Sequence, residues 1–379
     1  MKKVLYITTV SSTVNAFLVP HIETLINNGY KVDCAFSVNK PLDNSIVKLG
    51  VNQYDIPFSR NPLSFSNLKA FRKLIEIQKE NNYDIVHVHT PVASIYGRLL
   101  KLKFKQINVI YTVHGYHFFK GGSKLGWLIY YPIEKIMGSF TDIIININSE
   151  DYELTKKKIK HPKVYLVKGV GINLEKYTQL SKEEKDKKRK EIGINENDFI
   201  ITMIAELNKN KNQIQLIRAI EKINKECPRL KVLFIGEGPK IEYLKKEGIR
   251  RGVEEKLIFL GFRKDINELI NISDIGALLS YREGLPRSIM EFMANGKNII
   301  ATNIRGCKDL ISNDNIGKLV DVGDYETTGN VIQEYYNKKY LNKINDTHQN
   351  GSKKEFNECN IYSIKNINSE LLEIYKLID

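Results

Sequence analysis

The sequence has 379 residues, enough for two domains that each bury a core, and its four cysteines form no Cys-x-x-Cys pair, which excludes a zinc ribbon and a disulfide framework. The formal net charge of +14 is concentrated in residues 1–170, with 23 Lys and Arg against 12 Asp and Glu. These charges form no nucleic-acid-binding motif, so the expected partner is an anionic sugar nucleotide or membrane surface rather than nucleic acid. No stretch reaches the roughly 18 apolar residues that span a bilayer, and residues 3–9 are too short for a signal peptide, so we expect a cytoplasmic protein, soluble or peripheral.

In the first half, short apolar and β-branched runs alternate with helical stretches, which indicates βαβ units and a parallel sheet. Strands are expected at residues 3–8, 32–36, 85–89, 109–113, 142–146 and 164–167. The residues after the first strand lack the Gly-x-Gly-x-x-Gly pattern of NAD-binding domains. They include Ser12 and Thr13, whose hydroxyl and N–H groups can contact an anion. A plain turn into a helix beginning near Phe17 is equally compatible with this segment.

His114 follows the expected strand 109–113 and precedes Gly115, so it should lie at the carboxyl edge of the sheet, where ligands of open α/β sheets bind. His87 and His89 alternate along the expected strand 85–89. Alternation predicts that their side chains point to opposite faces, so a metal triad with His117 is not expected.

The segment 118–131 combines aromatic residues with Lys120 and Lys124 around three glycines, a mixture that suits a membrane interface. A partly buried helix whose Trp127 and Tyr131 pack on the core is an equally open interpretation.

The second half repeats the strand pattern at residues 199–204, 232–235, 257–260, 275–279, 299–301 and 319–320. Between the halves, residues 169–173 contain two glycines and lead into a charged stretch up to Lys190, so we expect a linker with its hinge between 169 and 195. The lysine-rich runs 156–158 and 185–190 are typical of solvated helix faces. Residues 361–377 have the pattern of a final helix.

Glu283 and Glu291 stand eight residues apart across an expected helix start. Pro286 suits the first helical position, which would place Glu283 in the loop and Glu291 inside the helix. The free N–H groups of the helix would attract a diphosphate, while Glu283 accepts hydrogen bonds from sugar hydroxyls and Glu291 from a ribose. Arg287 would lie in the first turn of this helix.

Gly236 and Gly238 follow an apolar strand, where the lack of a Cβ atom lets the backbone approach a base or ribose. Arg263 lies beyond the next strand and fits a uracil or phosphate contact. Both signals are weak when taken alone, because a surface loop explains them equally well.

The two glutamates and their surroundings resemble the donor site of retaining glycosyltransferases of family 4, which have the GT-B fold. The similarity spans nearly the whole chain and includes Gly236-Glu-Gly-Pro239, Gly261-Phe-Arg-Lys-Asp265 and Thr112-Val-His-Gly115. The segments 111–121 and 305–310 are closest to the capsule and exopolysaccharide branch of that family. The resemblance implies an α/β protein with two Rossmann-like domains whose parallel sheets face a central cleft.

In this family the two glutamates contact the donor sugar and the ribose, and the backbone of Gly284, Leu285 and Pro286 lies against sugar and phosphates. His114 matches the histidine near the reactive sugar carbon. The family also offers an arginine and a lysine to the diphosphate. Here Lys211 keeps the lysine position, whereas Glu206 replaces the arginine, so the missing charge is expected from Arg287, Lys209 or Arg282, with Arg287 favoured. A second possibility is that Glu206 pairs with Arg287 and orients it.

The resemblance therefore implies a retaining transferase that moves a sugar from a nucleotide diphosphate sugar, UDP-linked, to a lipid-linked saccharide in capsule or exopolysaccharide synthesis. Residues 1–170 would bind the acceptor, residues 171–360 the donor, and 361–379 would return to the first domain. The acceptor side would include Ser12, Thr13, Lys120 and Trp127. No cofactor or metal ion is expected. A nucleotide-sugar 2-epimerase of the same fold and a noncatalytic polysaccharide-assembly protein are the alternatives.

Overall fold

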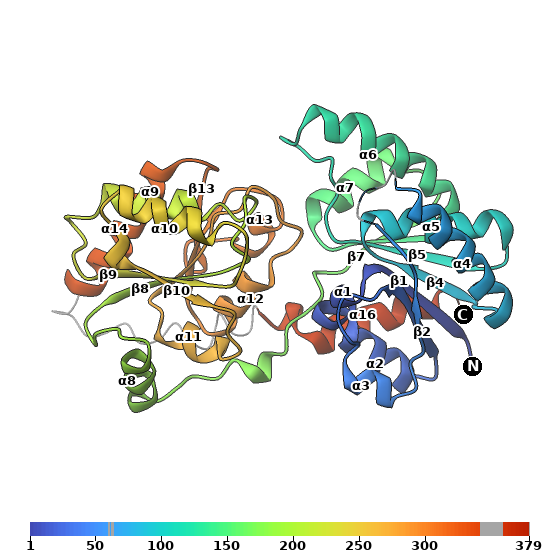
Figure 1. Cartoon of the computed structure of the whole chain (residues 1–379), viewed down its shortest axis with the longest axis horizontal. Helices are drawn as coiled ribbons and strands as arrows, with labels where there is room; N and C mark the ends of the chain where they lie inside the picture. Colours follow the sequence, from blue (N-terminus) through green and yellow to red (C-terminus); the bar gives the residue numbers. More distant parts are fainter. Residues whose placement is uncertain (60, 62–63, 342–358, 379) are drawn as a thin grey trace. The chain divides into compact units, whose positions relative to one another are not determined.

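The structure is a computed structural model that describes residues 1–59, 61, 64–341 and 359–378. Its contacts divide the chain into two compact units. Unit 1 consists of Met1–Gly171 together with Ile364–Asp379, and unit 2 consists of Ile172–Ser363. Each unit is built around one parallel sheet, which confirms the expected fold class of two α/β Rossmann-like units (Figure 1). The first boundary lies one residue from the division expected at 170.

Unit 1 has a seven-stranded sheet with the order β3-β2-β1-β4-β5-β6-β7. Its strands are β1 (Lys3–Val10), β2 (Lys31–Ser37), β3 (Gln53–Asp55), β4 (Ile85–Val88), β5 (Asn108–Val113), β6 (Ile143–Asn146) and β7 (Lys163–Leu166). The six predicted strands are present, and the sequence missed the three-residue edge strand β3 because it is too short and polar to show a pattern. Its main helices are α2 (Val19–Asn27), α3 (Asn44–Lys48), α4 (Ser66–Asn81), α5 (Pro91–Lys103), α6 (Lys124–Met137), α7 (Ser149–Lys158) and α16 (Ile364–Lys376).

Alternation along β1 sorts the core of unit 1 into two layers. Val4 and Tyr6 pack with residues of α2, α3 and α16, whereas Leu5 and Ile7 pack with residues of α4 and α5 on the other face. Because both faces are covered, the strands are apolar throughout rather than alternating with polar residues.

The residues after β1 form a helix rather than a loop. Helix α1 (Ser11–Thr13) starts immediately after Val10 and continues through a π-helical turn (Val14–Leu18) into α2. The prediction of a helix start near Phe17 is therefore wrong by six residues. Small hydroxyl side chains at 11–13 fit this tight strand-to-helix junction, and the Ser11 hydroxyl is buried and donates to the Lys40 carbonyl at 2.7 Å.

Helix α16 belongs to unit 1 although it ends the chain. It packs on α2, and its Ile367, Leu371 and Ile374 are buried in the same core layer as Leu25. Two polar contacts fix it: Asn368 Oδ1 lies 2.7 Å from His21 Nδ1, and Tyr375 Oη lies 2.7 Å from His87 Nδ1.

Unit 2 has a six-stranded sheet with the order β10-β9-β8-β11-β12-β13. Its strands are β8 (Phe199–Ile204), β9 (Leu230–Ile235), β10 (Leu257–Gly261), β11 (Ile275–Leu278), β12 (Asn298–Thr302) and β13 (Gly317–Val320), and all six were predicted. Its helices include α8 (Lys182–Glu191), α9 (Gln213–Lys222), α10 (Ile241–Arg250), α11 (Ile266–Ile272), α12 (Arg287–Ala294), α13 (Cys307–Leu310) and α14 (Tyr325–Leu341). In Figure 1, α9, α10 and α14 lie on one side of the sheet and α8 and α11 on the other.

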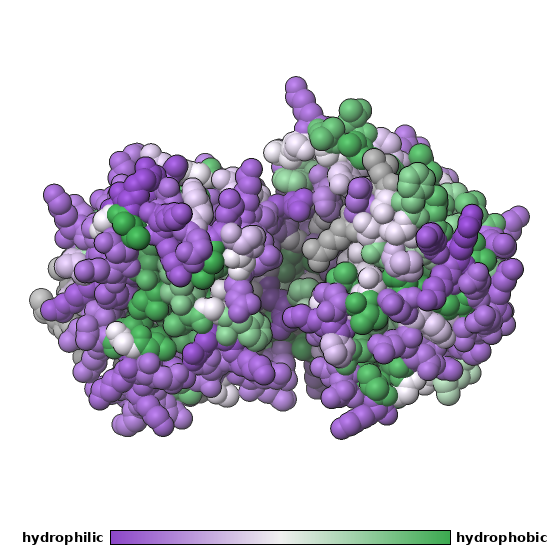
Figure 2. All heavy atoms as spheres, viewed as in Figure 1, coloured by the Kyte–Doolittle hydropathy of each residue, from purple (hydrophilic) through white to green (hydrophobic). Residues whose placement is uncertain are grey.

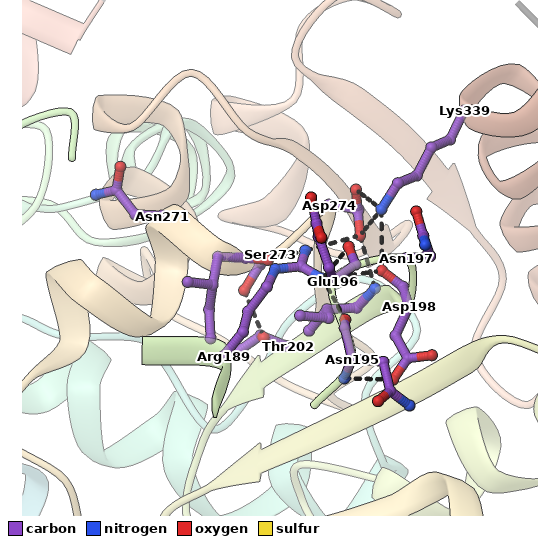
Figure 3. Close-up of polar contacts among 12 residues, drawn as sticks. Arg189, Asn195, Glu196, Asn197, Asp198, Thr202, Asn271, Ser273, Asp274 and Lys339 are labelled. Carbon is purple, nitrogen blue, oxygen red and sulfur yellow. Dashed lines mark hydrogen bonds and ion pairs between the residues drawn. The ribbon is translucent and has the colours of Figure 1, made fainter. Parts of the chain in front are cut away.

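The charged stretch expected as a linker is helix α8, attached to unit 2. A capping box of Ser181 and Glu184 starts it. Arg189 anchors it by donating from Nη1 to the carbonyls of Asn195, Glu196 and Asp198 and from Nη2 to that of Ile272 (Figure 3). The composition of residues 185–190 resembles that of a linker, but the positively charged Arg189 side chain binds groups at the amino ends of β8 and β11.

Among the described residues, none of the helices combines the length and the apolar character needed to cross a bilayer. The four cysteines are free and buried.

Candidate functional site

In unit 2, the strand order reverses between the neighbours β8 and β11. Ligands of open parallel sheets bind at such a switch point, outside the carboxyl ends of the strands. The loop 205–212 leaves β8 and the loop 279–286 leaves β11 at this place. The residues expected to hold the donor, Lys211 and Glu283, lie in these two loops.

Hydrogen bonds join the two loops. The Tyr281 N–H donates to the Asn210 carbonyl at 2.8 Å, and the Asn210 side-chain amide donates to the Arg282 carbonyl at 2.9 Å. Asn212, with a positive φ of 54°, donates from its side chain to the Leu279 carbonyl at 3.0 Å. The loops therefore hold each other in one conformation.

Lys211 and Glu283 form an ion pair across these loops, with Nζ 2.6 Å from Oε1. Their side chains are 23 % and 11 % exposed, so the pair is largely shielded but can be reached from solvent. Glu206 is exposed, and within the described part of the chain its carboxylate has no ion pair, so it does not orient Arg287.

Arg305 holds the backbone of Glu283 in place. Its side chain is buried, and Nε donates to the Glu283 carbonyl at 3.1 Å. The next residue, Gly306, has a φ of 74°, and a Cβ atom there would lie 2.1 Å from the Gly284 carbonyl oxygen. This support was not predicted from the sequence, because strand pairing, not local pattern, brings residue 305 beside residue 283.

Helix α12 begins at Arg287, and Pro286 is its N-cap rather than its first residue, one position from the prediction. Glu283 lies in the loop and Glu291 in the helix, as predicted. Arg287 Nη2 lies 3.7 Å from Glu291 Oε1, one turn along the helix. Burial and the Glu291 carboxylate raise the pKa of Tyr177, a neighbour that the sequence did not suggest. Leu285 is buried under the helix start.

Gly236 and Gly238 are required by packing inside unit 2. A Cβ atom at Gly236 would lie 2.3 Å from the Ala205 carbonyl oxygen, and one at Gly238 would lie 2.4 Å from that of Leu207. Both glycines thus bring the loop after β9 against the loop after β8, and their approach to a base or ribose stays a prediction.

Arg263 is engaged by carboxylates near α8. Its Nε donates to Asp265 at 2.8 Å, and its Nη2 lies 3.2 Å from Glu191. These interactions lower the pKa of Asp265 and raise that of Arg263. Its guanidinium is therefore neutralised within unit 2, which weakens the case for a phosphate contact.

In unit 1, His114 belongs to a buried histidine cluster that we define as His21, His87, His89 and His114. These side chains line a cavity of about 30 Å³ at the carboxyl ends of β1, β4 and β5. His89 Nδ1 lies 3.1 Å from His114 Nε2, and the rings of His87 and His89 are 4.3 Å apart. The prediction that His87 and His89 point to opposite faces is wrong, because β4 ends at Val88 and the chain turns before the alternation can continue.

Burial keeps the cluster uncharged at neutral pH. Loss of solvation lowers the pKa of His21 and of His114 to about 4. Burial and the neighbouring imidazoles also lower the pKa of His87 and His89 well below the usual value. His114 is the member of the cluster that keeps partial exposure.

The expected acceptor-side residues belong to two segments of unit 1, α1 and the region of α6 with the loop before it. Ser12 and Thr13 are in α1, where the Ser12 N–H donates to the Asn39 side chain at 3.0 Å. Lys120 is exposed in the loop before α6. Trp127 packs its ring 5.4 Å from Phe118 and donates from Nε1 to the Phe119 carbonyl, which supports the interpretation that it stabilises the core.

Together, unit 2 offers two carboxylates, two cations and the start of α12 at one sheet edge, a set able to hold hydroxyl groups and a diphosphate. In residues 1–59, 61, 64–341 and 359–378, no group of three His, Cys, Asp or Glu is arranged to hold a metal ion.

Comparisons with known proteins give a consistent result. Residues 184–354 match the family model of glycosyl transferases group 1, and residues 3–148 match that of the glycosyl transferase 4-like proteins. The putative glycosyltransferase EpsD of Bacillus subtilis is 35% identical over 344 residues, covering 90% of this chain and 89% of EpsD.

A second relative is the Escherichia coli UDP-Gal:alpha-D-GlcNAc-diphosphoundecaprenol alpha-1,3-galactosyltransferase, 28% identical over 340 residues, with 88% of this chain and 87% of that protein covered. Among solved structures, Anabaena HepE in complex with UDP and glucose superimposes with a TM-score of 0.80 at 18% identity, covering 99% of this chain and 100% of the other. At this identity the structural match bears on the fold alone.

Proposed function

Because this chain belongs to the glycosyltransferases of group 1 and has the GT-B fold, we propose that it transfers a sugar, with retention, from a UDP-linked donor to a lipid-linked saccharide in capsule or exopolysaccharide synthesis. The observation that carries the donor assignment is the placement of Lys211, Glu283, Arg287 and Glu291 at the switch point of the unit 2 sheet. The acceptor assignment is supported by the relative whose name specifies a diphosphoundecaprenol-linked acceptor.

The ion pair of Lys211 and Glu283 suggests how the donor enters. An arriving diphosphate attracts Lys211, and the sugar hydroxyls then donate to the released Glu283 carboxylate, so each charge exchanges one partner for another. Neither group is left buried without a partner, which would cost several kcal/mol. Glu291, one turn inside α12, accepts hydrogen bonds from the ribose.

The diphosphate is neutralised by Lys211 together with Arg287, which replaces the family arginine lost at Glu206. Arg287 stands in the first turn of α12, where the helix dipole also favours negative charge. The departing phosphate oxygen takes the acceptor proton on the same face of the sugar, so no carboxylate nucleophile and no metal ion are required.

Transfer is expected from a UDP-sugar to a polyprenyl diphosphate saccharide, and it should persist in EDTA. A panel of nucleotide sugars screened by thermal shift selects the donor, and mass spectrometry of the lipid product measures transfer. Retention is read from the anomeric coupling of the new linkage. A product that forms without acceptor and is an epimerised or hydrolysed sugar would instead favour the 2-epimerase, and donor binding without any product would favour a noncatalytic assembly protein.

Helix α6 supplies a surface for the lipid that carries the acceptor. Its exposed side includes Leu125 (64% exposed), Leu128 (74%) and Ile136 (60%). Apolar surface gathers over α6 in Figure 2. The exposed Lys120, Lys124 and Lys135 flank these residues. An apolar stripe bordered by cations matches an anionic membrane surface, with each cation contributing about 1 kcal/mol near the headgroups.

We expect binding to vesicles that contain anionic lipid, and Leu128→Ser should weaken it roughly tenfold, since burying a leucine contributes about 1.5–3 kcal/mol. Trp127, the single tryptophan of the sequence, lies on α6 and reports binding through its fluorescence. Ile249→Ser is the matched control, because Ile249 is an aliphatic residue of comparable exposure (64%, against 74% for Leu128) but lies on α10 of unit 2. Binding should also fall as salt rises. A protein that ignores anionic vesicles at low salt would point to a soluble acceptor.

A further inference from the structure

We propose that His89 is a positioning residue that fixes the tautomer and ring plane of His114. His89 Nδ1 lies 3.1 Å from His114 Nε2, and in the proposed arrangement it donates its hydrogen to that nitrogen, so that His114 carries its own proton on Nδ1. The expected effect on kcat rests on the proposed function and on the match of His114 to the family's histidine, whereas the tautomer of His114 rests on neither.

A strained turn brings His89 next to His114. Thr90 follows it with a φ of 41°, a conformation that a β-branched residue rarely adopts and that costs roughly 1–3 kcal/mol. The Thr90 hydroxyl accepts the Thr9 N–H at 3.0 Å and lies 2.8 Å from the Thr9 hydroxyl, so β1 holds the turn. Such strain persists only where the surroundings over-determine it, and here it brings the His89 ring to 5.3 Å from that of His114.

The His89 ring is itself immobilised. It stacks on Tyr6 with centroids 5.2 Å apart and planes inclined by 24°, and it is 2% exposed. The backbone N–H of His89 donates to the Ile7 carbonyl at 3.0 Å. A ring fixed on one side by β1 can impose its orientation on the partly exposed His114.

A single N–H···N hydrogen bond joins the imidazole rings of His89 and His114. Burial lowers the pKa of both groups, so both are neutral at pH 7, and each has one donor and one acceptor nitrogen. A contact of 3.1 Å between His89 Nδ1 and His114 Nε2 then requires that one nitrogen is protonated and the other is bare.

The surroundings of the second His89 nitrogen, Nε2, indicate whether the hydrogen of this contact belongs to His89 or to His114. His89 Nε2 is buried and has no hydrogen-bond partner among the described residues. A buried N–H without an acceptor is rarer in folded proteins than an acceptor with spare capacity. The His89 proton therefore lies on Nδ1, and it points at His114.

The tautomers can be read directly by nitrogen-15 NMR of the histidine-labelled full chain. The sequence contains seven histidines, few enough for a resolved long-range spectrum, and His114→Gln assigns the key resonances. We expect a protonated Nδ1 and a bare Nε2 on His114. A wild-type spectrum with the proton on Nε2 overturns the proposal.

Variants add a functional measurement. His89→Phe keeps a ring on Tyr6 but removes the donor, so the His114 tautomer should become mixed and kcat should fall roughly tenfold to a hundredfold, with UDP affinity unchanged. His89→Asn places an amide N–H near the Nδ1 position and should restore both the single tautomer of His114 and the kcat. His87→Phe is the control, since His87 bonds Tyr375 and Thr112 instead of His114 and should lower Tm without changing the His114 tautomer.

Full turnover of a folded His89→Phe protein with an unchanged spectrum would also reject the positioning role. If wild type transfers no sugar from any donor, the proposed function fails, and the tautomer spectrum still decides on His89. If His89→Phe does not fold, the wild-type and His89→Asn spectra decide.

Discussion

Glu283→Gln is expected to lower kcat by roughly 10²–10³ while UDP affinity changes little. Glutamine keeps the size of the side chain but loses the charge that pairs with Lys211 at 2.6 Å and that would accept hydrogen bonds from the donor sugar. Losing one well-placed charged contact to a reacting group costs roughly this factor. Steady-state kinetics and calorimetry with UDP separate the two quantities.

Glu291→Ala provides the contrast, because its carboxylate would hold the ribose; UDP affinity should fall about tenfold, the effect of one charged hydrogen bond of roughly 1.5 kcal/mol. Glu242→Gln is the matched control for charge, since Glu242 pairs with Lys245 on the surface of α10, outside the two loops that carry Lys211 and Glu283. Transfer at the normal rate by Glu283→Gln would show that this glutamate does not contact the reacting sugar.

Acid is expected to unfold unit 1 through its buried histidine cluster. In the unfolded chain each imidazole takes a proton as the pH falls through 6.5, whereas burial lowers the pKa of folded His21 and His114 to about 4. The unfolded state therefore binds more protons between these values, and the free energy of unfolding falls as the pH drops from about 6.5 to 4. For His21 this amounts to about 3 kcal/mol, a large part of the roughly 5–15 kcal/mol that stabilises a typical domain.

Urea unfolding followed by Trp127 fluorescence measures this dependence, because Trp127 reports on unit 1. In His21→Gln about one proton fewer should be taken up on unfolding, so the free energy of unfolding should depend less on pH. The variant also loses the Asn368 contact and is less stable at pH 7. His161→Asn is the control, as His161 is exposed and has a positive φ that asparagine tolerates. An unfolding free energy that stays constant from pH 6.5 to 4.5 would contradict the prediction.

The sequence predicted features that depend on local pattern. All strands longer than three residues were located, because buried parallel strands are continuous apolar runs. The placement of Glu283 and Glu291 followed from a strand, a loop and a proline in succession. Their roles in binding and catalysis stay predictions.

Features that depend on contacts between residues far apart in the chain could not be predicted from the sequence. Arg305 supports Glu283 across neighbouring strands, and Glu191, one of the two carboxylates that neutralise Arg263, lies 72 residues away from it. His89 was misplaced because its position depends on the turn at Thr90, whose positive φ has no signature in a β-branched residue. The lysine-rich run 185–190 is the solvated helix face that its pattern predicted, but the charged stretch up to Lys190 was wrongly expected to be a linker, because composition does not show that Arg189 reaches four backbone carbonyls.

The return of α16 to unit 1 sets the order in which the protein can be completed during synthesis. Ile367, Leu371, Ile374 and Tyr375 close a core layer whose other buried members leave the ribosome within the first 171 residues. At about 5–20 residues per second, that layer stays open for roughly 10–40 s while unit 2 is translated. The nascent chain thus carries an apolar sheet face that α2 and α3 cover only in part while unit 2 is synthesised, and the histidines bonded by Asn368 and Tyr375 reach their final environment only after α16 has been made.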